Sequence, residues 1–174
     1  MEKINITIVF ILITFMSFSQ SIQDIRLQNL GSTVTVTGIA TNGIELGDIR
    51  YIQDSTAGIA LYDLSTNNYL TNILRGDSLT ISGELADYNG LLEIYVTGPP
   101  IIHSNNNIVP NPQIVSPSQV GETTESEIVQ INNSIFNSGG SIFGVGTYDF
   151  ASNGQQGKIY LRTNHPLLGS LIPT

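Results

Sequence analysis

The stretch that decides the fold runs from residue 49 to residue 64 and reads IRYIQDSTAGIALYDL. Two short runs rich in β-branched and aromatic residues, 49–54 and 59–64, flank a turn at residues 55–58. This arrangement is typical of a β-hairpin, and we expect Gly58 to close its turn with a positive φ angle. The rest of the predicted sheet is built around this hairpin.

One strand precedes this hairpin and a second hairpin follows it. Residues 32–40 alternate valine with threonine, the period of two expected when one face of a strand is buried. Gly38 lies inside that strand, where glycine permits a bulge, so one strand can serve both sides of a barrel. Residues 79–85 and 91–97 alternate in the same way around Asn89-Gly90, a strong type I′ turn signal. Five strands in this order predict a small closed β-barrel.

The segments that follow each hairpin are less regular. Residues 65–74 are either a loop or a short helix with apolar residues on one face, and we favour the helix. Residues 99–120 contain five prolines and an Asn-Asn-Asn run, which predicts a linker or an extended wrap.

Residues 121–174 repeat part of the first pattern. Residues 127–136 predict a strand, and residues 146–153 and 157–162 predict a hairpin. Placing Gly157 on Gly58 aligns Asn153 with Asp54 without a gap, which indicates an internal repeat. The second copy lacks its last two strands, so we expect an incomplete barrel with unpaired edges that is poorly stable on its own.

The first nineteen residues predict an export signal. Lys3 gives a short cationic start, residues 8–16 are almost entirely apolar, and residues 17–19 offer small side chains before Gln20. A membrane anchor would need roughly 20 apolar residues. The chain has no cysteine, which excludes disulfides and anchoring through a lipidated cysteine. We therefore expect a bacterial protein that is secreted or displayed on the cell surface, with no membrane span after signal cleavage.

The charge balance limits the ligands. The net charge is −8, with only six lysines and arginines. Nonspecific nucleic-acid binding is driven by counterion release and normally needs an excess of basic residues. The composition therefore argues against strong nonspecific DNA binding, although a local basic strip is compatible with it.

Three stretches carry a resemblance to a known family: VTVTGIA, YIQDSTAGIALYD and GDSLTISGELADYNGLLEI. They resemble the OB-fold domains of exported bacterial endonucleases and Bacteroidetes surface proteins, over roughly residues 30–165. The resemblance implies an all-β protein, with a five-stranded OB-fold Greek-key barrel followed by an incomplete second OB-like copy. It divides the chain into a signal peptide (1–19), an OB-fold domain (20–98), a linker (99–120) and a truncated second domain (121–174). The family is described as nucleic-acid-binding largely by analogy of fold.

Catalysis has little support in the sequence. His103 and His165 lie among asparagines and prolines, and no dense set of metal ligands is present. Four aspartates at strand ends and turns are expected to cap turns rather than to bind calcium: Asp48, Asp54, Asp63 and Asp77. We expect no catalytic residues, no metal and no cofactor.

Binding has more support. OB barrels commonly bind through the outer face of strands two and three and through the 1–2 and 4–5 loops. On the first copy this surface is expected to offer four candidates: Arg50, Tyr51, Tyr62 and Tyr88. On the second copy, Lys158, Tyr160 and Arg162 alternate along one strand and share a face, as single-stranded nucleic acid requires. The alternative is an ordinary solvated sheet face.

Three functions follow as expectations. The first is a non-catalytic binding module at the N-terminal end of a larger exported protein, which binds single-stranded nucleic acid or another extracellular polymer, or positions a substrate for a downstream domain. The second is a structural or adhesive spacer on the cell surface. The third is the N-terminal region of a secreted nuclease or phosphoesterase whose catalytic domain lies downstream.

Overall fold

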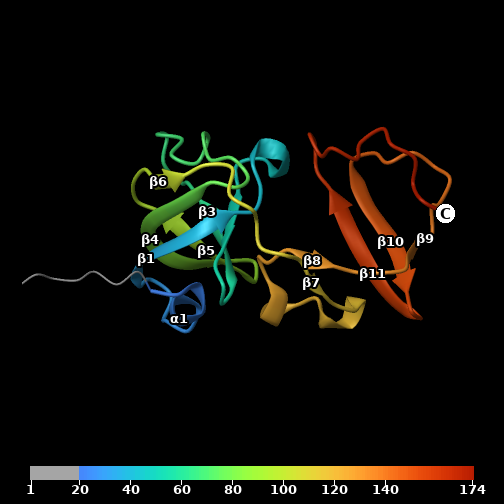
Figure 1. Ribbon diagram of the computed structural model, residues 1–174, viewed down its shortest axis with the longest axis horizontal. Helices are drawn as coiled ribbons and strands as arrows, with labels where there is room; N and C mark the ends of the chain where they lie inside the picture. The colour runs from blue at the N-terminus through green and yellow to red at the C-terminus, as the bar shows by residue number, and fades with distance from the viewer. Residues whose placement is uncertain (1–19) are drawn as a thin grey trace, which may run out of the picture.

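The structure, a computed structural model, describes residues 20–174, and the predicted signal peptide lies outside the described residues. Figure 1 shows two units side by side, a closed barrel and a three-stranded sheet, joined by an extended segment. Among the described residues the only α-helix is the short α1 (Ile22–Arg26), so the chain is all-β as predicted. Residues 20–174 contain no helix of the length and apolarity needed to cross a membrane.

Five strands close the barrel: β1 (Thr33–Ala40), β2 (Arg50–Gln53), β3 (Gly58–Tyr62), β4 (Ser78–Tyr88) and β5 (Leu91–Val96). Their order is β1-β2-β3-β5-β4, and β4 pairs back with β1. Only the β3–β5 pairing is parallel. This closed five-stranded arrangement confirms the predicted OB-like barrel.

The barrel interior is filled by the inward-facing half of each strand, and α1 closes one end with Ile22 and Ile25. β1 runs along β4 up to Ile39 and along β2 at Ile39 and Ala40, so one strand does serve both sides. The bend that permits this lies at Gly38, as expected. The barrel strands contribute these buried apolar residues: Val34, Val36, Ala40, Ile52, Ile59, Leu61, Leu79, Ile81, Leu85, Ile94 and Val96.

Two local predictions within the barrel are wrong. Gly58 does not have a positive φ; it lies in β3 opposite Gln53, and the loop it follows is 54–57. Residues 65–74 form turns rather than a helix. The Asp63 carboxylate accepts from the backbone N–H groups of Ser65 (2.7 Å) and Tyr69 (2.6 Å), which stabilises a loop instead of helical hydrogen bonds. The predicted turn at Asn89-Gly90 is confirmed, since both residues have positive φ (54° and 89°).

The segment after the barrel lies along its surface. β6 (Ile101–Ser104) pairs with β4, and β7 (Gln113–Ile114) pairs in parallel with β8 (Val129–Gln130). Three single-turn 3-10 helices complete the irregular parts of the chain: η1 (Ile44–Leu46), η2 (Pro117–Gln119) and η3 (Glu122–Thr124). The proline-rich stretch thus includes a strand of the barrel sheet, which its sequence gave no reason to expect.

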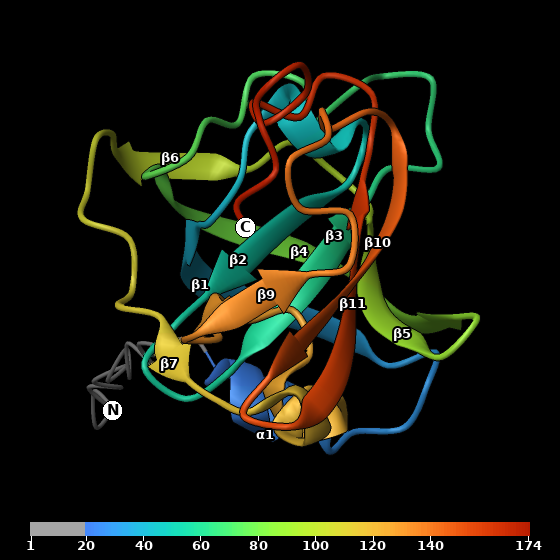
Figure 2. The same ribbon diagram turned by 90° about the vertical axis from the view of Figure 1, so that its right-hand side faces the viewer.

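The second unit is an antiparallel sheet of β9 (Ser134–Phe136), β10 (Gly146–Ser152) and β11 (Gln155–Leu161), in the order β11-β10-β9. The meander has the connectivity of the first three barrel strands. Its small core contains Phe143, Leu161 and Ile172, from the sheet and the chain that covers one of its faces. Figure 2 shows the sheet standing over the side of the barrel formed by β2 and β3.

The repeat alignment is wrong in the register of the second hairpin. Asn153 and Gly154 both have positive φ (50° and 81°) and form a two-residue turn between Ser152 and Gln155. Asn-Gly favours this tight turn, whereas the first hairpin has a four-residue loop. Gly157 therefore lies opposite Phe150, two residues into the strand, rather than at the end of the turn.

Candidate functional site

Three neighbouring strands present one outer face of the barrel. Tyr51 of β2 lies opposite Ala60 of β3, which in turn lies opposite Glu93 of β5. In the next row Tyr62 lies opposite Tyr95. Because successive side chains on a strand point to opposite faces, all five share the outer face, while the residues between them point into the core.

This face forms the floor of a cleft of about 500 Å³, within the size range of small-molecule sites. Its walls come from the loop between β1 and β2, the β4–β5 turn, and the chain just after β11. Aromatic and aliphatic side chains alternate with a few charged ones. The lining residues are Asp48, Ile49, Tyr51, Tyr62, Leu64, Tyr88, Leu91, Glu93, Tyr95 and Arg162.

Four tyrosines line the cleft, and three of them were predicted as binding residues. Tyr51 and Tyr62 are partly buried on the floor, and Tyr88 is 62% exposed at the β4–β5 turn. The fourth, Tyr95, packs beside Tyr62, with ring centroids 6.4 Å apart and ring planes at 58°. The structure therefore brings Tyr51, Tyr62 and Tyr88 together, on the surface through which OB barrels commonly bind.

Glu93 is the buried charge of the cleft, with 3% of its surface exposed. Burial raises the pKa of its carboxyl group and Asp87 raises it further, while a hydrogen bond with Tyr95 opposes them. Burial also raises the pKa of the Tyr51 hydroxyl, against the lowering effect of the Arg162 guanidinium. The floor of the cleft is thus a poorly hydrated place with a carboxylate at its centre.

Arg162 brings the second unit into the site. It follows β11 directly and lines the cleft, and its guanidinium lies 3.8 Å from where a side chain on Gly47 would begin. Tyr160 and Lys158 share its face of β11 but do not line the cleft. Lys158 pairs with Asp149 (3.4 Å) in an exposed ion pair, and Tyr160 is 62% exposed. Of the predicted basic strip, only Arg162 reaches the barrel site.

Arg50 is not a binding residue, contrary to the prediction. Its side chain is 1% exposed and donates to the carbonyl oxygens of Ile73 (3.3 Å), Gly47 (2.6 Å) and Ile49 (3.0 Å). Arg50 precedes Tyr51 on β2, and neighbouring residues of a strand cannot both face outward. The arginine instead satisfies carbonyl groups at the end of the barrel that the turns of 65–74 cover.

Several cleft residues were missed from the sequence, above all Glu93 and Tyr95. The signal was present, because the predicted inward set of the fifth strand (Leu92, Ile94 and Val96) leaves Leu91, Glu93 and Tyr95 outward. What was lacking was the parallel pairing of β5 with β3, which places these residues beside Tyr62.

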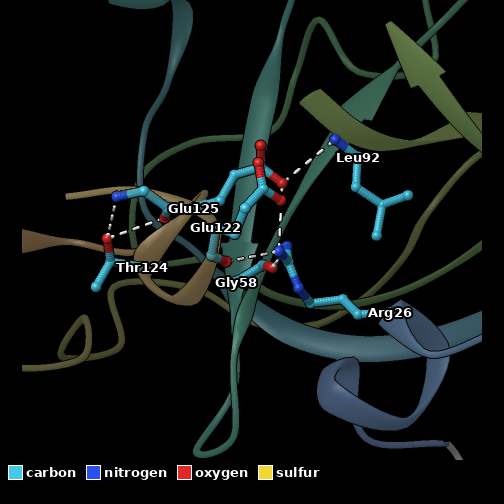
Figure 3. A network of polar contacts seen from close by, with 7 residues as sticks. Arg26, Gly58, Leu92, Glu122, Thr124 and Glu125 are labelled. Atoms are coloured by element: carbon cyan, nitrogen blue, oxygen red, sulfur yellow. Dashed lines mark hydrogen bonds and ion pairs between the residues drawn. The ribbon is translucent and has the colours of Figure 1, made fainter. Parts of the chain in front are cut away.

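A polar joint holds the second unit against the barrel (Figure 3). Arg26 of α1 donates to the carbonyl oxygens of Gly58 (2.9 Å) and Glu122 (3.1 Å), and pairs with the Glu125 carboxylate at 3.3 Å. Glu125 also accepts from the backbone N–H of Leu92 (3.3 Å). Both side chains of the ion pair are at least 85% buried. The joint thereby connects α1, β3 and β5 to the chain that leads into the second unit.

Most other polar candidates have structural partners. The carboxylates of Asp54, Asp63 and Asp77 accept from backbone N–H groups of their own turns, as predicted. His103 bonds to the Thr80 hydroxyl (2.7 Å), and His165 accepts from its own turn. In residues 20–174 no three histidine, aspartate or glutamate side chains come together as metal ligands would.

The chain matches no model of a known protein family, and no curated protein matches it. Among solved structures it is similar to the hypothetical protein ygiW from E. coli. The two are 16% identical, the similarity covers 50% of this chain and 91% of that one, and the TM-score is 0.41. The OB-like fold is assigned by the strand order of the barrel itself.

Proposed function

We propose that this chain is a non-catalytic binding module of an exported bacterial protein, and that its ligand occupies the tyrosine-lined cleft. The observation that carries the proposal is the meeting of Tyr51, Tyr62 and Tyr95, from three adjacent strands, in one cleft on the outer face of the barrel. Aromatic side chains supply large contact areas, and four of them in one cleft exceed what packing of the barrel requires.

Single-stranded nucleic acid is the ligand that the resemblance implies. Exposed tyrosines can stack with bases, each stack contributing about 1–3 kcal/mol. The cleft holds two carboxylates, Asp48 and Glu93, and one cation, Arg162, which is an unfavourable balance for phosphate. We therefore keep the binding function as the proposal and treat nucleic acid as one ligand to be tested.

The test is a titration of isotope-labelled protein followed by NMR, with a thymidine octanucleotide, a neutral oligosaccharide and a lysine-containing peptide. Binding in the cleft would shift the signals of Tyr51, Tyr62 and Tyr95, and Tyr62→Ala would weaken it about tenfold or more. Tyr160→Ala is the matched control, since Tyr160 is exposed but lies outside the cleft. The proposal fails if none of the three compounds shifts the cleft signals, or if Tyr62→Ala binds as well as the control.

Nucleic-acid binding has its own signature. Affinity for the octanucleotide should fall with rising salt, and the double substitution Lys158→Ala and Arg162→Ala should reduce the salt dependence. A salt-independent interaction, or one that the double substitution leaves unchanged, would rule out an oligonucleotide site on this strip.

A spacer function is the second candidate, and the buried joint between the units favours it. A spacer must keep its parts in a fixed orientation, and the Arg26–Glu125 pair with its four carbonyl and amide contacts provides that restraint. Small-angle scattering of the native chain and of Arg26→Ala would test it. An unchanged scattering profile would show that the joint does not set the orientation.

A further inference from the structure

We infer that the cleft binds an organic cation, an ammonium group carried by a small molecule or by the lysine side chain of a peptide. The inference rests on the proposed function, because it takes the cleft as the binding site and names the chemistry of the ligand. It departs from the oligonucleotide that the OB fold would suggest.

The shape of the cleft floor suits a compact group. Ala60 lies between Tyr51 and Glu93 across the three strands, so the row is low at its centre and higher at both sides. Two strand spacings separate the flanking residues, about 10 Å between their backbones. A ring on one side, a carboxylate on the other and the Tyr62 and Tyr95 rings in the next row enclose a space of ammonium size. Tyrosine rings that surround a cation within about 6 Å attract it through their π-electrons.

The charges of the cleft favour a cation. Glu93 at the floor and Asp48 at the rim are opposed by Arg162 alone. Two further carboxylates act on cleft residues from outside it, Asp87 on Glu93 and Glu125 on Tyr51. The chain as a whole carries −8, so the long-range field also attracts cations and repels phosphate.

Glu93 gives the cleft an unmet demand for positive charge. The groups that face it are Tyr95 on its own strand, Tyr51 across the sheet, Asp87 on β4, and Arg162 beyond Tyr51. Its carboxylate is 3% exposed, and no ion pair with it is present among the described residues. Burying a carboxylate without a counterion is costly, and a bound ammonium group would supply that counterion. Since burial raises the pKa of Glu93, cation binding should release a proton and tighten as the pH rises through that pKa.

Arg162 supplies a test of sign. It is the positive charge at the rim, so Arg162→Ala should tighten the binding of a cation and weaken the binding of an anion. Lys158→Ala removes the same charge from the same face of β11 outside the cleft and is the matched control. It should change either affinity by much less.

The experiment is a calorimetric and NMR titration of residues 20–174 with choline and, separately, with a capped glycine-lysine-glycine peptide. The uncharged carbon analogue of choline keeps the shape of the ligand and removes its charge, and a thymidine octanucleotide serves as the anion. We expect choline or the lysine peptide to bind at least about tenfold more tightly than the uncharged analogue. Glu93→Gln should remove most of this preference together with its pH dependence. Choline binding alone would identify a small-molecule amine, and peptide binding alone would identify a protein partner.

The outcomes separate the two proposals. Equal binding of choline and its uncharged analogue, or octanucleotide binding that Arg162→Ala weakens, would overturn the cationic ligand and leave the binding function intact. Titrations in which no compound shifts the signals of the cleft tyrosines would overturn both. Glu93→Gln removes a buried charge, so we expect this variant to stay folded, and a thermal melt checks it.

Discussion

Gly58→Ala should separate the two units without unfolding the barrel. Gly58 lies in β3 where the chain leading to the second unit crosses it, and a Cβ atom there would be 2.2 Å from the Ser126 carbonyl oxygen and 2.5 Å from its carbon. Both are backbone atoms, and ordinary contacts begin near 3.4 Å. The crossing chain must therefore move away by about 1 Å.

This displacement has a cost that the contacts of the joint define. Moving the crossing chain by this amount breaks the contacts of Arg26 with Glu125 (3.3 Å) and Glu122 (3.1 Å), and the bond from the Ile128 N–H to Gln53 (3.1 Å). Steric overpacking costs about 1–3 kcal/mol, and hydrogen bonds contribute about 1 kcal/mol each. We expect Gly58→Ala to lower the free energy of unfolding by about 2–4 kcal/mol.

The assay is urea denaturation followed by tyrosine fluorescence, since the chain has seven tyrosines and no tryptophan. Hydrogen exchange of the Leu92 and Ile128 amides gives a local readout, and both should exchange faster in the variant. Gly98→Ala is the control, because nothing lies within 4 Å of its added Cβ and its backbone is unstrained. If the two variants agree within about 0.5 kcal/mol, the steric account of Gly58 is wrong.

Three further predictions concern the barrel core, a turn and the second sheet. Arg50→Ala leaves three carbonyl contacts and a large volume unfilled and should cost about 3–5 kcal/mol by urea denaturation, whereas Arg162→Ala should cost under about 0.5. The Asp54 carboxyl is partly desolvated, but its hydrogen bonds with the Ile22–Ala57 region lower its pKa overall, so it stabilises the fold above its unfolded pKa of about 3.9 and this contribution is lost as the pH falls through the lower folded value; Asp54→Asn should flatten the melting temperature between about pH 5 and pH 2, and an unchanged profile would contradict this. Gly157→Ala would place a Cβ 2.4 Å from the Phe150 ring, so the β10–β11 amides should lose exchange protection while the barrel amides keep theirs.

The cleft explains why a buried carboxylate is compatible with a stable barrel. Glu93 lies on the outer face, where its desolvation comes from neighbouring tyrosines rather than from the core. Its raised pKa means that the folded state binds its proton more tightly than the unfolded state does, so ionisation between the two values lowers stability as the pH rises. Glu93→Gln should therefore stabilise the unliganded chain at neutral pH, a change a melting curve would show. Sites that bind charge commonly keep such a destabilising group.

The sequence alone determined the strands and most of the turns. Alternation in residues 32–40 and the Asn89-Gly90 dipeptide are local signals, because side-chain direction and turn conformation depend on a few neighbouring residues. The same alternation, applied strictly, would have placed Arg50 inside the barrel once Tyr51 was placed outside. The Asn153-Gly154 turn was likewise readable, and the repeat alignment obscured it.

Only the tertiary structure decided the site. Glu93 and Tyr95 join Tyr62 because β5 pairs in parallel with β3, a contact between strands separated by the whole of β4. Arg162 reaches the cleft because Arg26 and Glu125 hold the second unit beside the barrel, across 99 positions of the chain. Pairings at such distances depend on which surfaces are buried together when the chain closes, and no local pattern of residues encodes them.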